Sequence, residues 1–141
     1  MSMAGDLQAL GRAIKQAQYR HHRALDSRLT TVGTTLAQWD ALRAIDREPG
    51  SSARALAEET FQSEQAFGTL ANRLASRGLI DRTPGHGRLI EHRLTPEGRR
   101  TLAAGNKIAD NVLAESFADL SASERETLRT LLQRVGAGSR A

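Results

Sequence analysis

Residues 51–98 decide the fold, and they read SSARALAEET FQSEQAFGTL ANRLASRGLI DRTPGHGRLI EHRLTPEG. A serine at 51 or 52 can cap a short helix over residues 53–59, because its hydroxyl oxygen accepts a free backbone N–H. After a turn at residues 60–62, Ser63 can cap a second helix, in which apolar side chains recur every three or four residues up to Leu74. This order predicts a helix-turn-helix.

The segment after residue 78 changes from a helical to an extended pattern. Short runs at residues 79–83 and 89–94 flank Pro84-Gly85-His86-Gly87, and two glycines and a proline at that spacing predict a β-hairpin. Thr95 followed by Pro96 predicts the start of another helix. A unit of this kind commonly places its second helix in the DNA major groove, with the basic hairpin loop beside it.

Long amphipathic helices are expected on both sides of this unit. Residues 6–30 carry apolar side chains at helical spacing with Asp6 as the cap, and a further helix with Trp39 on its apolar face ends near residue 49. Residues 101–135 continue the helix that begins at Thr95 and, after a capping box, form the last helix. The expected fold class is mainly α with a small β-wing, a winged helix-turn-helix plus long N- and C-terminal helices.

Composition places the chain among single-domain globular proteins. Its 141 residues suit one domain over residues 1–141, and 39% apolar with 4% aromatic residues favours helices around an aliphatic core. There is no cysteine, which excludes disulfides and thiolate metal sites. No apolar run is long enough to span a membrane, so we expect a cytoplasmic protein without a membrane partner.

The net charge of +4 is concentrated in one part of the chain. Residues 66–100 hold seven arginines and three acidic residues, and this surplus of four equals the surplus of the whole chain. A solvated basic face is one explanation. The other is a phosphate-binding surface, because clustered cations gain free energy when they release counterions from DNA.

The order of predicted elements resembles the MarR family of winged-helix transcriptional regulators over residues 6–135. The residues that carry the resemblance are Leu36, Gln38, Trp39, Leu42, Leu56, Ala57, Leu74, Gly78, Leu79, Ile80, Arg82, Leu94, Thr95 and Gly98. The resemblance implies a DNA-binding lobe over residues 34–100 and a homodimer in which residues 6–30 and 101–135 of two copies interlock. It also implies binding to a near-palindromic operator in double-stranded DNA, usually as a repressor that a small, often phenolic, ligand releases.

The wing departs from the family pattern at one position. The family usually has Asp-x-Arg before the Leu-Thr pair, and here the residues are His86-Gly87-Arg88. The aspartate normally helps to brace the wing, so this departure leaves the geometry of the wing open. Arg88 keeps the position for which the resemblance implies insertion into the DNA minor groove.

The candidate DNA contacts lie on the second helix of the motif, on its flanks and in the wing. Gln65 and Thr69 are the strongest candidates for base contacts, because glutamine can pair with adenine and a threonine methyl can touch thymine. An ordinary solvent-exposed face is the alternative, and Glu64 on the same side would repel phosphate. The other candidates for base or phosphate contact are Ser63, Ala66 and Arg73 on this helix, Ser52 and Arg54 at a helix N-terminus, and Arg82 and Arg93 beside the wing.

The candidate ligand-binding residues are Tyr19, His21, Trp39 and Phe61, near a cleft that the resemblance implies between the dimer helices and the DNA-binding lobe. Core packing is the alternative for the aromatic residues. The four histidines do not have the spacing of a metal site, so we expect no metal and no cofactor. No catalytic pair or triad lies on a plausible scaffold, which predicts that the protein is not an enzyme.

Two other functions stay open at the level of the sequence. A winged helix can serve as a protein-interaction module without ligand or sequence-specific DNA binding, and Glu64 and the replaced wing aspartate favour that function. The arginine surplus favours DNA binding instead. A DNA-binding protein that has no effector is the third possibility.

Overall fold

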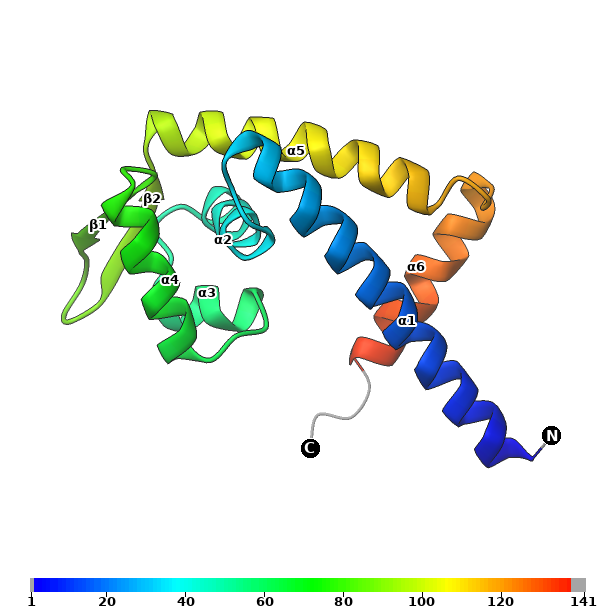
Figure 1. Ribbon diagram of the computed structural model, residues 1–141. Helices are drawn as coiled ribbons and strands as arrows, with labels where there is room; N and C mark the ends of the chain where they lie inside the picture. The colour runs from blue at the N-terminus through cyan, green and yellow to red at the C-terminus, as the bar shows by residue number, and fades with distance from the viewer. Residues whose placement is uncertain (1, 138–141) are drawn as a thin grey trace.

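The computed structural model describes residues 2–137 and confirms the expected fold class (Figure 1). The elements in chain order are α1 (Met3–Leu29), a short 3-10 helix η1 (Thr30–Val32), α2 (Leu36–Arg47), α3 (Ala53–Glu59), α4 (Glu64–Ser76), β1 (Ile80–Pro84), β2 (Ile90–Leu94), α5 (Pro96–Ser116) and α6 (Ala122–Ala137). The helices α2 to α4 and the hairpin form the winged helix-turn-helix, which α5 connects to α6.

Side-chain caps fix where the central helices begin. The hydroxyl oxygens of Ser52, Ser63 and Thr95 accept backbone N–H groups three residues ahead, at 3.2, 3.0 and 3.0 Å. Ser121 and Glu124 exchange the two hydrogen bonds of a capping box at 3.1 and 2.9 Å. These four starts agree with the positions that the sequence predicts.

The first helix begins earlier than the sequence predicts. Ser2 is its cap and accepts the N–H of Gly5 at 3.2 Å, so the prediction that Asp6 caps this helix is wrong. Asp6 lies in the first turn, where its negative charge interacts favourably with the positive end of the helix dipole.

The two strands pair antiparallel, with Ile80 opposite Leu94 and Pro84 opposite Ile90. Both begin one residue later than expected. Leu79 stays outside β1, and its carbonyl accepts the N–H of Thr95 at 3.1 Å, which holds the start of α5 against the end of α4.

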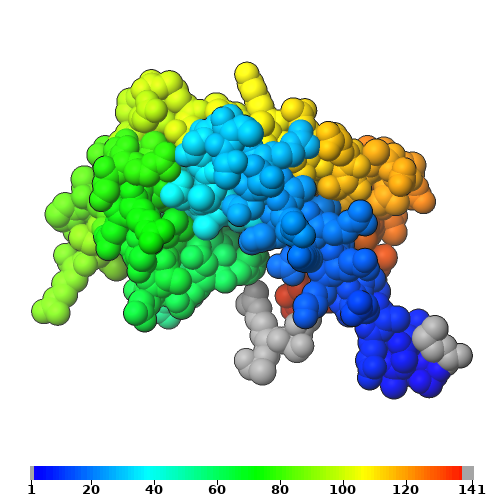
Figure 2. Space-filling view, viewed as in Figure 1, coloured from blue at the N-terminus to red at the C-terminus, as the bar shows by residue number. Residues whose placement is uncertain are grey.

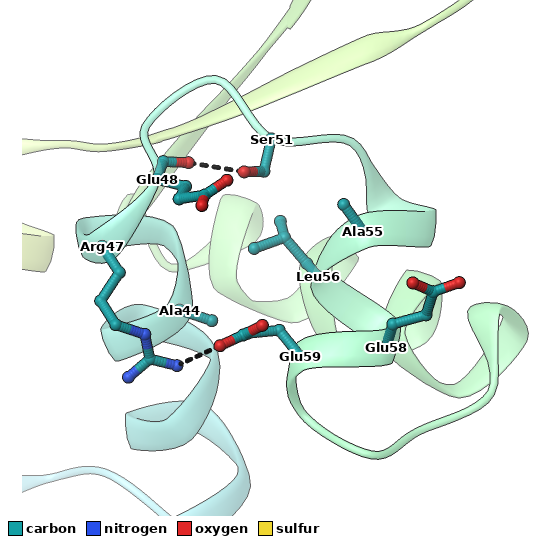
Figure 3. Close-up of a pocket in the computed structure, with 8 residues that line it drawn as sticks. All are labelled: Ala44, Arg47, Glu48, Ser51, Ala55, Leu56, Glu58 and Glu59. Carbon is teal, nitrogen blue, oxygen red and sulfur yellow. Dashed lines mark hydrogen bonds and ion pairs between the residues drawn. The ribbon is translucent and has the colours of Figure 1, made fainter. Parts of the chain in front are cut away.

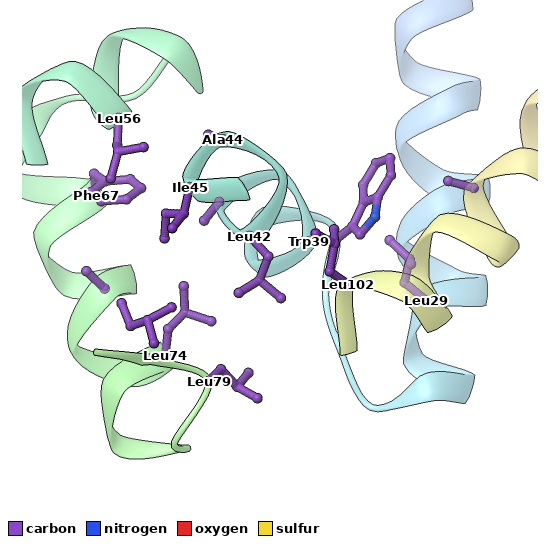
Figure 4. Close-up of a cluster of buried hydrophobic side chains, with 14 of the residues drawn as sticks. Leu29, Trp39, Leu42, Ala44, Ile45, Leu56, Phe67, Leu74, Leu79 and Leu102 are labelled. Carbon is purple, nitrogen blue, oxygen red and sulfur yellow. The ribbon is translucent and has the colours of Figure 1, made fainter. Parts of the chain in front are cut away.

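The hydrophobic core centres on α2 (Figure 4). Leu42 and Ile45 of α2 are fully buried, and α3 and α4 contribute Leu56, Phe67 and Leu74 to the same core. Trp39 of α2 lies toward α1 and α5, where Leu29 and Leu102 pack (Figure 4). A single core therefore joins the helix-turn-helix to the long helices.

Two helices leave apolar side chains outside this core. Leu7 and Leu10 of α1 are 56% and 54% exposed, and α6 has no buried residue although it carries Leu131 and Leu132. The N-terminal part of α1, dark blue in Figure 2, protrudes from the body of the molecule. Within residues 2–137 of one chain, nothing covers these faces.

None of the helices in the described part of the chain combines the length and the apolar character needed to cross a membrane.

Candidate nucleic-acid interface

The exposed face of α4 carries the residues that the sequence predicts for base contacts. Phe67, Ala71 and Leu74 anchor one side of the helix in the core. The opposite side exposes Ser63, Gln65, Ala66, Thr69, Asn72 and Arg73. The Thr69 hydroxyl donates to the Gln65 carbonyl at 3.2 Å, whereas no side-chain hydrogen bond within residues 2–137 engages the Gln65 amide. The Gln65 amide can therefore pair with a base edge, and the bound Thr69 hydroxyl can still accept.

The N-terminus of α3 is a second polar feature of this lobe. Ser52 is half-buried because it caps the helix, and Arg54 is exposed. The Arg54 guanidinium lies 3.9 Å from the Glu58 carboxylate one turn later, a solvent-exposed pair that adds little stability. Both residues are accessible from the N-terminal end of α3, where backbone N–H groups can receive a phosphate.

The arginine surplus of residues 66–100 divides into two groups. Arg77 donates to Gln38 Oε1 at 2.7 Å and to the Gly33 carbonyl at 2.8 Å, so it ties α4 to the start of α2. Arg82 donates to the side chain of Asn72, Arg93 pairs with Glu91, Arg99 donates to the Leu94 carbonyl, and Arg100 pairs with Glu97.

The second group consists of Arg73 on α4 and Arg88 in the wing, which are exposed and make no side-chain hydrogen bond or ion pair within residues 2–137. These two arginines carry the least compensated positive charge of the lobe.

A brace that the sequence analysis missed holds the base of the wing. Glu91 Oε1 accepts from Arg93 Nη2 at 2.7 Å, and a Cβ added at Gly85 would lie 2.6 Å from Glu91 Oε2. A Cβ at Gly50 would lie 2.9 Å from Arg93 Nη2. The pair therefore packs on glycines at both of its ends. Glu91 and Arg93 are two residues apart in a strand and so share a face, a signal that the sequence does contain.

His92 ties the wing to the rest of the lobe from the other face of β2. It is fully buried, its Nδ1 lies 2.9 Å from the Ser51 carbonyl oxygen, and its ring meets Phe67 of α4 edge to face at 6.0 Å between centroids. The carbonyl can only accept, so we assign the proton to Nδ1. Nε2 is then an unprotonated acceptor, buried without a hydrogen-bond partner in the described structure.

The burial of His92 has a consequence for stability. Desolvation lowers its pKa below the ordinary value of about 6.5, the hydrogen bond to Ser51 opposes this shift, and the charge of Arg82 adds to it. The unfolded chain therefore takes up a proton at a higher pH than the folded chain. Stability is full above about pH 6.5 and falls as the pH drops through 6.5 toward the lowered folded pKa.

The variant His92→Asn is expected to flatten this pH dependence, because asparagine can still donate to the Ser51 carbonyl but does not titrate. Urea unfolding at several pH values between 5 and 7 measures the effect. The wild-type free energy of unfolding should fall toward pH 5, by at most about 1.4 kcal/mol per pH unit from this group, with a smaller slope in the variant. Equal slopes in both proteins would show that another group titrates.

The four predicted ligand-binding residues do not meet in one cavity of the described chain. Trp39 is 4% exposed and donates its indole N–H to Asn106 Oδ1 at 2.9 Å, so it packs in the core. Tyr19 is half exposed on α1, beside Arg23. His21 meets Phe117 edge to face at 5.1 Å between centroids. Phe61 is 97% exposed in the turn between α3 and α4.

Two cavities of about 500 Å³ each offer room for a small molecule. One lies between α2 and α3, where Arg47 pairs with Glu59 at 3.4 Å and the Glu48 and Glu58 carboxyl groups add negative charge (Figure 3). This cavity disfavours an anionic ligand. The other is an apolar groove along α6, lined by Phe117, Arg125, Leu128, Arg129, Leu132 and Gln133. Of the four predicted ligand residues, His21 contacts a residue that lines this groove, Phe117.

No group of three metal-ligating side chains comes together in residues 2–137.

Comparison with known proteins adds three findings. The sequence model of the MarR family matches residues 32–89. The transcriptional regulator HosA of Escherichia coli O127:H6 is 32% identical over 105 residues, which span 72% of this chain and 76% of HosA. A variant of Escherichia coli MarR, solved in complex with operator DNA, superimposes with a TM-score of 0.85 at 23% identity and covers 96% of this chain and 99% of its own.

A further solved structure carries a small molecule. The Mycobacterium tuberculosis MarR-family protein Rv2887, in complex with salicylic acid, superimposes with a TM-score of 0.73 at 23% identity and covers 89% of this chain and 95% of its own. The same protein is described as a transcriptional repressor and is 26% identical over 110 residues, 77% of this chain and 79% of Rv2887.

Proposed function

Since the chain belongs to the MarR family of DNA-binding transcriptional regulators, we propose that two copies of it bind a near-palindromic operator and repress transcription until a small molecule releases them. The observation that carries the proposal is the exposed polar face of α4, which includes Arg73, together with Arg88 in the wing; within residues 2–137 neither arginine has an ion-pair or side-chain hydrogen-bond partner. The relatives HosA and Rv2887, named a regulator and a repressor, support the same function.

Each part of the proposed interface has a separate role. Gln65 and Thr69 read base edges in the major groove, with Ser63, Ala66 and Arg73 beside them. Ser52 and Arg54 hold a backbone phosphate at the N-terminus of α3. Arg88 enters the minor groove from the tip of the wing. Arg82 and Arg93 contribute less, because Asn72 and Glu91 already engage their guanidinium groups.

The uncovered faces of α1 and α6 support the homodimer. Met3, Leu7, Leu10 and Ile14 follow each other at helical spacing and are 38–77% exposed, and on α6 Leu131 and Val135 are 47% and 63% exposed. A contiguous apolar surface on these elements disfavours a monomer in water. We assign residues 6–30 and 101–135 to dimerisation and residues 34–100 to DNA binding.

The apolar groove along α6 is the proposed effector site. Its apolar lining suits an aromatic ring, and the Arg125 guanidinium at its edge suits a carboxylate or a phenolate. Salicylic acid, which Rv2887 binds, has both features. His21 and Tyr19 on α1 are the other candidates near this end of the molecule, whereas Trp39 and Phe61 are not placed to reach the groove.

A protein-interaction module without DNA binding is the alternative. Glu64 on the exposed side of α4 is its support, since a carboxylate there disfavours a phosphate backbone. Arg73 on the same helix and Arg88 in the wing oppose it.

Two alanine variants are expected to separate base recognition from backbone binding. Gln65→Ala should cost about 1–3 kcal/mol on a duplex selected from random sequences by the wild-type protein, and little on a scrambled duplex. Arg88→Ala should weaken both duplexes and lower the slope of log affinity against log salt by about one per subunit if it neutralises a phosphate. Fluorescence anisotropy titrations at two salt concentrations measure both effects.

Lys107→Ala, which removes an exposed positive charge from α5, is the control and should change neither quantity. If Gln65→Ala weakens both duplexes equally while Arg88→Ala changes the sequence preference, the two elements have been assigned the wrong way round. The same titration with salicylate added tests the effector: a duplex that stays bound at saturating salicylate contradicts that part of the proposal.

A further inference from the structure

Phe61 adopts a backbone conformation that side chains avoid. Its φ is 58°. Among residues 2–137, Phe61 is the only residue other than glycine whose φ is positive. Its N–H donates to the Glu58 carbonyl at 3.2 Å, and the next N–H, of Gln62, donates to the Ala57 carbonyl at 2.9 Å. These two bonds define the left-handed turn that ends many helices, a position normally held by glycine.

The chain makes the same turn at two other places, and both have glycine there. After α4, Gly78 has a φ of 74° and donates to the Ala75 carbonyl. After η1, Gly33 has a φ of 76° and donates to the Thr30 carbonyl. A left-handed backbone strains a residue that carries a side chain, and Gly33 and Gly78 avoid this strain.

The ring of Phe61 makes no packing contact within residues 2–137 that could offset the strain of its backbone. It is 97% exposed, so almost all of its apolar surface faces water. A single exposed apolar residue is ordinary on protein surfaces and carries no inference alone. Exposure combined with a strained backbone is different, because strain of this kind concentrates at positions that contact something outside the chain.

The position of the turn indicates what that contact is. The turn connects α3 to the N-terminal end of α4 (Figure 1). Ser63, the cap of α4, is two residues after Phe61. Residues 58–64 include Glu58, Glu59 and Glu64 and no basic residue, so this turn cannot neutralise a phosphate. An aromatic ring there can contact the uncharged groups of a duplex, the deoxyribose and the thymine methyl.

We propose that Phe61 is a DNA-contact residue, which packs its ring on uncharged sugar or thymine methyl groups at the edge of the major groove entered by α4. The inference rests on the proposed DNA binding of α4. It replaces the expectation that Phe61 binds an effector. The strained turn holds the ring outward in the free protein, so that little conformational entropy is lost when the duplex binds.

Two variants test the inference. Phe61→Gly removes the ring and the strain together, so Tm should rise by about 2–4 °C while affinity for the selected duplex falls about 5- to 30-fold. The slope of log affinity against log salt should stay unchanged, because no phosphate contact is lost. Phe61→Tyr keeps both the ring and the strain and should keep both the Tm and the affinity of the wild type.

Four results would overturn the inference. Wild-type affinity in Phe61→Gly would show that the ring makes no DNA contact. A dimer that dissociates in Phe61→Gly, seen by sedimentation, would place the ring at the partner copy instead. A smaller slope of log affinity against log salt in Phe61→Gly would show that phosphate contacts are lost as well, and therefore that the whole interface is disturbed. Failure of the wild-type protein itself to bind any duplex would overturn the proposed function, and the inference with it.

Discussion

Replacing Gly98 with alanine is expected to lower the free energy of unfolding by about 3 kcal/mol or more. Gly98 is buried in the first turn of α5, and a Cβ at this position would overlap the carbonyl oxygen of Leu79. That carbonyl accepts the N–H of Thr95, and the Thr95 hydroxyl donates to the Gly78 carbonyl at 2.6 Å. The group that the added Cβ would meet is a backbone carbonyl held in place by hydrogen bonds, so it cannot shift without a large loss of stability.

Thermal unfolding at one fixed protein concentration measures this prediction, and Tm should fall by about 6–12 °C. Gly68→Ala is the matched control, because it lies inside α4 and an added Cβ would meet nothing within 4 Å. Alanine there should stabilise by up to about 1 kcal/mol, since it favours helix over glycine. Equal Tm values for Gly98→Ala and the wild type would contradict the close approach of α5 to the end of α4.

The second prediction concerns the apolar face of α1. In the proposed dimer this face is covered by the partner, so the double variant Leu10→Glu with Ile14→Glu should leave carboxylates in an apolar interface. We expect dissociation into monomers by sedimentation. Affinity for a duplex with two half-sites should fall by roughly 10²- to 10⁴-fold, because the second recognition helix no longer binds from the same particle.

A matched control separates the effect of where the charge is placed on α1 from the effect of the added charge itself. Gln8→Glu with Gln16→Glu adds the same charge to α1, at exposed positions on the opposite side of the helix from Leu10 and Ile14. This control should remain dimeric with wild-type affinity. A Leu10→Glu, Ile14→Glu protein that stays dimeric and binds the duplex normally would rule out α1 as the dimer interface.

The order of elements could be predicted from the sequence because their signals are local. Ser52, Ser63 and Thr95 are at caps that depend only on their own hydroxyl and the next three residues. The start of α1 was predicted wrongly at Asp6, because Asp6 directly precedes the first apolar residues at helical spacing. In the structure residues 3–5 are helical as well, and Ser2 is the cap. Helix starts at chain ends have several polar candidates, and propensity does not choose among them.

The charges of the candidate interface could be predicted only in part. That arginines cluster between residues 66 and 100 is visible in the sequence, but which of them are already engaged depends on contacts across the fold. Arg77 donates to Gln38, which is 39 residues away, and no local pattern announces such a pair. Glu91 and Arg93, by contrast, share one face of a strand, and strand alternation alone indicates their pairing.

The four predicted ligand residues could not be told apart from core residues by the sequence alone, for a similar reason. Aromatic residues look alike in a sequence whether they pack in a core, as Trp39 does, or extend into water, as Phe61 does. A left-handed backbone at a phenylalanine has no sequence signature, so the role of the Phe61 turn required the three-dimensional structure.

The most direct test of the central claim is a titration of the wild-type protein on two versions of its selected duplex. One keeps the natural spacing of the half-sites, and the other has five base pairs inserted between them, about half a helical turn. Insertion turns the second half-site to the opposite side of the duplex, so two recognition helices held by one dimer cannot reach both. We predict that affinity falls to that of a duplex with one half-site. Equal affinity for the two duplexes would contradict recognition by a rigid homodimer.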